Sequence, residues 1–162
     1  MDNSIFQWFN QFFSKEWAVF FTAGLPIVEL RGAIPLAISL GIEPGKAYWL
    51  AVFGNVVPVI PLLLLLQPVR DLLIRYSALM ERFFNWLDQR TLRKSKQINK
   101  YGALGLILFT AIPLPTTGAW TASMAAILFK IRFRYAFPAI VAGILLAGVI
   151  VLILSLTGQA IL

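Results

Sequence analysis

The chain has 162 residues, of which 59% are hydrophobic and only 13% charged, and its mean hydropathy is +0.80. Soluble domains are about 45–50% apolar and about 25% charged, so this composition predicts one all-α integral membrane domain over residues 1–162. The absence of Cys and His excludes thiol, disulfide, zinc and imidazole chemistry, and we expect neither an enzyme nor a cofactor or metal site. We attribute the net charge of +7 to loops that face anionic lipid, and expect no nucleic-acid partner.

Residues 1–16 precede the first long apolar stretch. Their apolar side chains recur at helical spacing, which predicts a short helix in the membrane interface, with a frayed tail as the alternative. The side chains in question are Ile5, Phe6, Phe9, Phe12 and Phe13.

Residues 17–42 form the first long apolar stretch, and proline and glycine interrupt its centre. A proline in a helix interior costs about 3 kcal/mol, and Pro26, Gly32 and Pro35 together predict a break. Each flanking half covers about 15–21 Å, which is too short to cross a hydrocarbon core of about 30 Å. We therefore predict a re-entrant helical hairpin whose tip is shielded from lipid by protein or water.

Residues 47–66 are an apolar run long enough to cross the bilayer as one helix, and they complete a first repeat over residues 17–66. Residues 67–101 are the least hydrophobic part of the chain. An apolar stripe with arginines opposite predicts an amphipathic helix there, on the cytoplasmic surface between the repeats. The stripe consists of Leu72, Leu73, Tyr76, Met80, Phe83, Phe84 and Leu87.

Residues 102–129 repeat the interrupted pattern, with the prolines and threonines of residues 113–118 at their centre, and predict a second re-entrant hairpin. Residues 135–157 cover about 34 Å as a helix and predict the second spanning helix. Together these segments form a second repeat within residues 102–162.

Short matches at a nearly constant spacing support the repeat. The second copies follow the first after 86 to 89 residues, and both copies keep the same order along the chain. A re-entrant hairpin crosses zero times and the long helix once, so the second copy is inverted relative to the first. The matched pairs are Phe21-Thr22-Ala23 with Phe109-Thr110-Ala111, Gly32-Ala33 with Gly118-Ala119, Lys46-Ala47 with Arg134-Tyr135, and Gly54 with Gly143.

The distribution of basic residues favours re-entrant hairpins. With such hairpins, residues 67–101 and 130–134 share one side and carry eleven Lys and Arg residues, whereas Lys15 and Lys46 are alone on the other side. If both interrupted stretches crossed the membrane, the division would be nine to four. The positive-inside rule therefore predicts a multi-pass protein of the cell (inner) membrane with both termini extracytoplasmic.

The predicted hairpin tips hold the candidate functional residues. Glu29 and Arg31 are ionisable groups at membrane depth, where such groups are usually functional, and Glu29 is a candidate proton-coupling carboxylate; a structural ion pair is the alternative. Thr116 or Thr117 can cap the helix that returns from the second tip, beside Gly118. The equivalent helix of the first hairpin is expected to start at Gly32. The two helix starts and Arg31 would attract an anionic group. Asn55 in the first spanning helix is a weaker candidate, since a membrane Asn often only joins helices.

The two tip motifs, Glu29-Leu30-Arg31-Gly32-Ala33-Ile34-Pro35 and Pro113-Leu114-Pro115-Thr116-Thr117-Gly118-Ala119, resemble those of the bacterial and archaeal small multidrug export proteins. That family is distantly similar to the DedA membrane proteins, which share the inverted re-entrant plan and are implicated in proton-coupled flipping of polyprenyl-phosphate lipids. The resemblance implies that Glu29 matches the acidic residue of the first DedA hairpin. The second DedA hairpin typically has an arginine where this chain has Thr116 or Thr117.

Three functions follow as hypotheses. The first is a small proton-coupled transporter with its substrate site between the two tips. The second is a flippase for a phosphate-bearing polyprenyl lipid, and the third is a structural or assembly membrane protein without transport. A chain of this size needs further shielding for its irregular tips, so we also predict a homodimer, with anionic lipids at its basic cytoplasmic face.

Overall fold

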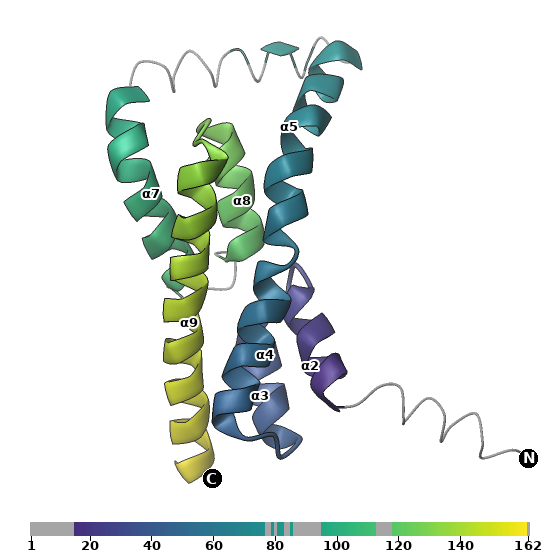
Figure 1. Cartoon of the computed structure of the whole chain (residues 1–162), viewed down its shortest axis with the longest axis vertical. Coiled ribbons are helices and arrows are strands. Elements are labelled where there is room, and N and C mark those ends of the chain that lie inside the picture. The colour runs from purple at the N-terminus through teal and green to yellow at the C-terminus, as the bar shows by residue number, and fades with distance from the viewer. Residues whose placement is uncertain are drawn as a thin grey trace, which may run out of the picture. The chain divides into compact units, whose positions relative to one another are not determined.

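The computed structural model describes residues 15–76, 79, 81–82, 85, 95–112 and 118–161, and the regular elements within these ranges are all helices (Figure 1). Two runs are long and apolar enough to cross a membrane, Pro44–Leu65 and Phe133–Gly158. They contain nearly all of the two segments predicted to span, as expected for a membrane protein. The helices are α2 (Lys15–Gly24), α3 (Glu29–Ser39), α4 (Pro44–Val56), α5 (Val59–Tyr76), α7 (Ser95–Ala111), α8 (Ala119–Leu128) and α9 (Phe133–Ile161).

The chain divides into two compact units, and the first comprises residues 1–55 and 148–162. Within it, α2 and α3 pack together as a helical hairpin whose connection is residues 25–28 (Figure 1). The turn is closed by backbone hydrogen bonds, from Leu25 N–H to Thr22 O at 3.2 Å and from Glu29 N–H to Leu25 O at 3.1 Å. The first interrupted stretch therefore contains two short helices joined by a turn, each about 15–17 Å long.

Glycine allows α4 to approach this hairpin closely. A Cβ atom at Gly54 would lie 2.2 Å from the carbonyl oxygen of Phe20, and one at Gly24 would lie 3.2 Å from the carbonyl oxygen of Gly54. Backbone atoms cannot rotate away as a side chain can, so α2 and α4 touch here without intervening side chains. The end of α2 that leads into the hairpin turn consequently lies beside the end of α4.

The second unit comprises residues 56–147. Within it, α8 packs against both α5 and α7 (Figure 1). The first part of α9 meets α7 at another glycine, because a Cβ atom at Gly143 would lie 2.5 Å from the Cβ atom of Thr110 and 2.9 Å from the carbonyl oxygen of Ile107. A glycine thus brings α4 against α2 in the first unit and α9 against α7 in the second.

Helices α3 and α8 end in the same way. Beyond α3, Gly41 N–H donates to Ile38 O and Ile42 N–H donates to Ala37 O, both at 3.0 Å. Beyond α8, the N–H groups of the residues 89 positions later, Lys130 and Ile131, donate to Ile127 O at 3.0 Å and to Ala126 O at 2.8 Å. This pair of bonds is the Schellman motif, in which the residue after the helix adopts a left-handed conformation.

The left-handed residue differs between the two motifs. It is Gly41 with φ 77° after α3, but Lys130 with φ 52° after α8. A residue with a Cβ atom loses about 1–2 kcal/mol in this conformation. We expect Lys130→Gly to raise the free energy of unfolding by about 1 kcal/mol, measured as a higher melting temperature of the purified protein. Lys130→Ala, which also removes the charge but keeps a Cβ atom, should give no such gain; an equal gain in both variants would contradict the explanation.

The first spanning segment differs from its prediction, because it is two helices rather than one. α4 ends at Val56 and α5 begins at Val59. Pro58 and Pro61 lack N–H groups and cannot donate to the carbonyls four residues earlier, which explains the interruption. The same prolines were visible in the sequence, but the apolar run around them predicted a continuous helix.

Both ends of the predicted linker, residues 67–101, belong to the neighbouring helices. α5 extends to Tyr76, and α7 already starts at Ser95. Leu72 and Tyr76 of the predicted apolar stripe are exposed in the single chain. Residues 1–14 of the predicted interfacial helix, and most of residues 77–94, lie outside the described residues.

Candidate functional site

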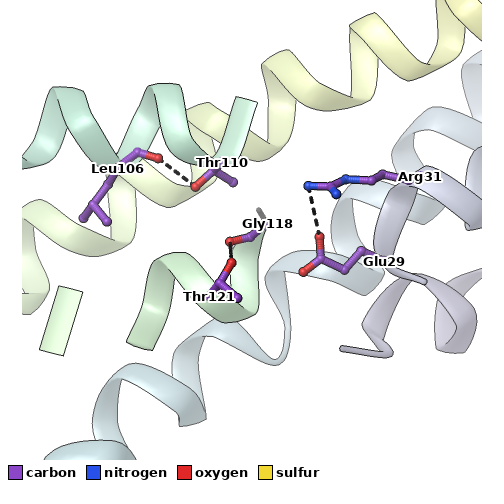
Figure 2. A network of polar contacts seen from close by, with 6 residues as sticks. All are labelled: Glu29, Arg31, Leu106, Thr110, Gly118 and Thr121. Carbon is purple, nitrogen blue, oxygen red and sulfur yellow. Dashed lines mark hydrogen bonds and ion pairs between the residues drawn. The ribbon is translucent and has the colours of Figure 1, made fainter. Parts of the chain in front are cut away.

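Glu29 and Arg31 are brought together at the start of α3. One Arg31 nitrogen, Nη2, lies 4.0 Å from the Oε2 atom of Glu29 (Figure 2). The Glu29 side chain is only 7% exposed, and that of Arg31 is 19% exposed. A charge removed from solvent needs a partner or a proton to neutralise it. The predicted contact between these two groups is thus present, at the edge of ion-pair distance.

The backbone at Glu29 is strained. Its φ angle is +49°, and among the described residues only Glu29 and Lys130 have a positive φ without being glycine. Such a conformation costs of order 1–3 kcal/mol and persists where the surrounding structure imposes it, often at functional positions. Here the hairpin turn imposes it, because Glu29 follows the connection and is the first residue of α3. The turn thereby holds the carboxylate in the interior of the unit.

Helix α3 starts three residues earlier than predicted, and this changes the expected role of Gly32. Gly32 lies inside the helix, and its N–H donates to Val28 O at 3.2 Å. It is therefore not a free amide that could bind an anion. A Cβ atom at Gly32 would lie 2.3 Å from the Val28 side chain, so this glycine serves packing at the turn. Pro35 accordingly lies in the second turn of the helix, not in its first.

In the second interrupted stretch, the structure places Gly118 directly before α8. Gly118 is buried, has an extended conformation and is the N-cap residue, and among the described residues no side chain makes a capping hydrogen bond there. Its carbonyl oxygen accepts from Ala122 N–H at 2.8 Å and from the Thr121 hydroxyl at 3.2 Å (Figure 2). The N-cap position is thus Gly118, and the predicted capping by a threonine stays a prediction. Thr116 and Thr117 lie outside the described residues.

Two buried hydroxyls of the second unit did not figure among the predicted site residues. Thr110 is 2% exposed and donates to Leu106 O at 2.7 Å (Figure 2), and Ser123 is 0% exposed and donates to Ala119 O at 2.7 Å. Such bonds to the carbonyl four residues earlier satisfy the hydroxyl donor within its own helix. Their presence in apolar stretches of α7 and α8 was the available signal in the sequence. Both groups are explained by local hydrogen bonding.

Asn55 belongs to the first unit and is the penultimate residue of α4. It is 1% exposed, and its Oδ1 atom is a buried oxygen that accepts no hydrogen bond within the described residues. The predicted structural role, in which the amide joins neighbouring helices, does not account for this oxygen. The first unit therefore contains a buried carboxylate and a buried, unsatisfied amide oxygen, both of which were candidates from the sequence.

Comparison with known proteins identifies the family. Residues 29–150 match the family described as "Putative small multi-drug export protein". The chain belongs to this family. The match begins at Glu29 and includes Arg31, Asn55 and Gly118, as well as the twin ends of α3 and α8. It confirms the resemblance drawn from the two tip motifs.

The candidate site therefore belongs to a member of the small multi-drug export family. No curated protein matches the chain, and no solved structure matches it. Within the described residues, no group of three or more acidic, His or Cys residues could hold a metal ion. The family's name describes export, and the membrane-spanning helices are consistent with that description.

Proposed function

We propose that this member of the small multi-drug export family is a proton-coupled exporter and that Glu29 is the group that carries the proton. The observation that supports this most directly is a nearly buried carboxylate in a strained turn of a membrane protein. An ionisable group at membrane depth is expensive, and such groups mark proton and substrate pathways. Arg31 is close enough to stabilise the ionised form after the proton leaves.

The dimensions of the first hairpin support a re-entrant arrangement. Its helices have 10 and 11 residues, which is about half the thickness of the hydrocarbon core. Charged groups gather at its open end, where Lys46 Nζ lies 2.9 Å from Glu16 Oε1 and Lys15 Nζ donates to Leu40 O at 3.0 Å. The turn at its other end exposes apolar side chains, with Ile27 90% exposed. We infer that the open end lies at the membrane surface and the turn within the bilayer.

The twin features of the two units support an internal repeat. The Schellman motifs after α3 and α8 are 89 residues apart, as are the first residues of α4 and α9 and the glycines at positions 54 and 143. The fully buried Ala47 and Ala136 keep the same spacing. A repeat that crosses the membrane once leaves the next repeat in the opposite orientation. We therefore propose that the two turns after α3 and α8 face opposite sides of the membrane.

Single-cysteine labelling tests this topology, because the chain contains no native Cys. We expect Gly45→Cys, after α3, to react with an impermeant maleimide added outside intact cells. Arg134→Cys, after α8, should react only after the membrane is permeabilised. Both positions are exposed in the structure, so burial does not confound the comparison. Labelling of both residues from the same side would rule out the inverted repeat.

Transport itself is tested in liposomes that contain the purified protein. An imposed pH gradient should drive movement of a lipophilic cationic dye and should be dissipated faster when the dye is present. A fluorescent polyprenyl-phosphate lipid, assayed in parallel, detects flippase activity instead. The absence of gradient-driven movement of either probe would contradict the proposal. The homodimer and the contact with anionic lipid stay predictions, and size measurement in detergent addresses the first.

A further inference from the structure

The amide oxygen of Asn55 is the unsatisfied polar atom that the proposed mechanism leaves unused. It is buried, and no group among the described residues donates a hydrogen bond to it. A buried acceptor without a donor costs about 1–3 kcal/mol. A leucine would avoid this cost at a buried position of α4. The chain therefore carries an energetic penalty at this position that its own fold does not explain.

The equivalent position of the second repeat provides a comparison. The residue 89 positions after Asn55 is Ile144, which is 0% exposed and apolar. The described buried hydroxyls of the second unit, Thr110 and Ser123, both donate to carbonyls of their own helices. The matching position in α9 is thus occupied by a buried hydrophobic side chain. Asn55 is a departure from the repeat, and it lies in the unit that also contains Glu29.

The end of α4 adds further acceptors around Asn55. Pro58 has no N–H, so the Gly54 carbonyl cannot receive the usual helical bond from the residue four positions later. The last carbonyls of a helix carry a partial negative charge. The Gly54 carbonyl lies against Gly24 at the end of α2, which precedes the hairpin turn that leads to Glu29. This end of the unit therefore contains the Gly54 carbonyl as a second acceptor beside Asn55 Oδ1.

We propose that Asn55 Oδ1 accepts a hydrogen bond from an N–H or O–H group of the transported molecule. The inference rests on the proposed export function and specifies its substrate class as lipophilic molecules that carry a hydrogen-bond donor. On binding, the donor group of the ligand would give up its hydrogen bond to water and donate instead to Asn55 Oδ1. Glu29 in the same unit would supply the proton coupling. A molecule without a donor gains nothing from this contact and leaves the oxygen unsatisfied.

Two lipophilic cations that differ in donors test the proposal. Ethidium carries two aromatic amino groups, whereas tetraphenylphosphonium has no N–H or O–H group. We expect Asn55→Leu to weaken ethidium binding about tenfold, the value of one hydrogen bond, and to leave tetraphenylphosphonium binding unchanged. Dissociation constants are measured on the purified full-length protein in detergent, without a pH gradient. Asn55→Asp, which keeps an acceptor oxygen at the same place, should retain ethidium binding.

Stability measurements separate this role from a packing role. Asn55→Leu should raise the melting temperature of the unliganded protein, since the unsatisfied oxygen is removed, while reducing the additional stabilisation by ethidium. Equal ethidium affinity in wild type and Asn55→Leu, equal weakening of both cations, or no ethidium binding to wild type would each overturn the proposal. If Asn55→Leu does not fold, loss of ethidium binding in Asn55→Asp would overturn it instead. Failure of the export function appears separately, as a lack of gradient-driven movement in liposomes while binding in detergent persists.

Discussion

Replacing Glu29 with glutamine is expected to abolish pH-driven transport. Glutamine has nearly the same size and polarity as glutamate, but it cannot bind and release a proton. If Glu29 carries the proton across the membrane, the gradient-driven rate in liposomes should fall about tenfold or more, to the level of protein-free liposomes. The measurement is dye movement with and without the gradient, at equal protein content.

Glu43→Gln is the matched control for this experiment. Glu43 lies in the connection between α3 and α4 and is exposed, so it belongs to the same unit without being buried. We expect wild-type transport from this variant. If Glu29→Gln transports normally but melts at a lower temperature, then Glu29 and Arg31 form a structural ion pair, and the proton-coupling role is wrong. Loss of transport in both variants would point to a general effect of removing a negative charge from this unit.

A methyl group at Gly54 is expected to have the largest effect on stability. Its carbon would lie 2.2 Å from the Phe20 carbonyl oxygen and 3.0 Å from the Ala23 side chain. Because the first of these atoms is backbone, α2 and α4 must move apart to relieve the clash. Overpacking of this kind costs about 1–3 kcal/mol and occasionally more, so we expect Gly54→Ala to lose about 3 kcal/mol. The readout is the melting temperature in detergent.

Other glycines of the chain provide the controls. A Cβ atom added at Gly105 would meet no other atom within 4 Å, so Gly105→Ala should be neutral or slightly stabilising through its helix propensity. Gly143→Ala should resemble Gly54→Ala, because its Cβ atom would meet Thr110 at 2.5 Å. A Gly54→Ala protein that melts with the wild type would show that α2 and α4 are not held at this distance.

Much of the fold was predictable because its determinants are local. An apolar run of membrane length predicts a spanning helix whatever its neighbours are, and clustered prolines and glycines favour a break between helices. The two runs long and apolar enough to span, and the short helices α2 and α3, were found in this way. The same reasoning marked Glu29, since a carboxylate in an apolar stretch stands out from its composition alone. Pro58 was a local signal for a break, but the length of the apolar run around it led to the prediction of one continuous helix.

The start of α3 was not predictable from local rules. Gly32 and Pro35 favour a helix start near themselves, but the observed helix begins at Glu29, where the hairpin turn holds a non-glycine residue at positive φ. Tertiary packing of α3 on α2 imposes this conformation against the intrinsic preference of glutamate. The predicted free amide at Gly32 was lost for the same reason.

The sequence by itself determined the membrane class, the spanning segments and the identity of the buried carboxylate, because hydrophobicity and proline act within single segments. Only the tertiary structure decided which helices touch through Gly54 and Gly143, that Arg31 lies 4.0 Å from Glu29, and that Asn55 keeps an unsatisfied oxygen. These properties depend on which residues of different helices face one another, and packing between helices fixes that arrangement.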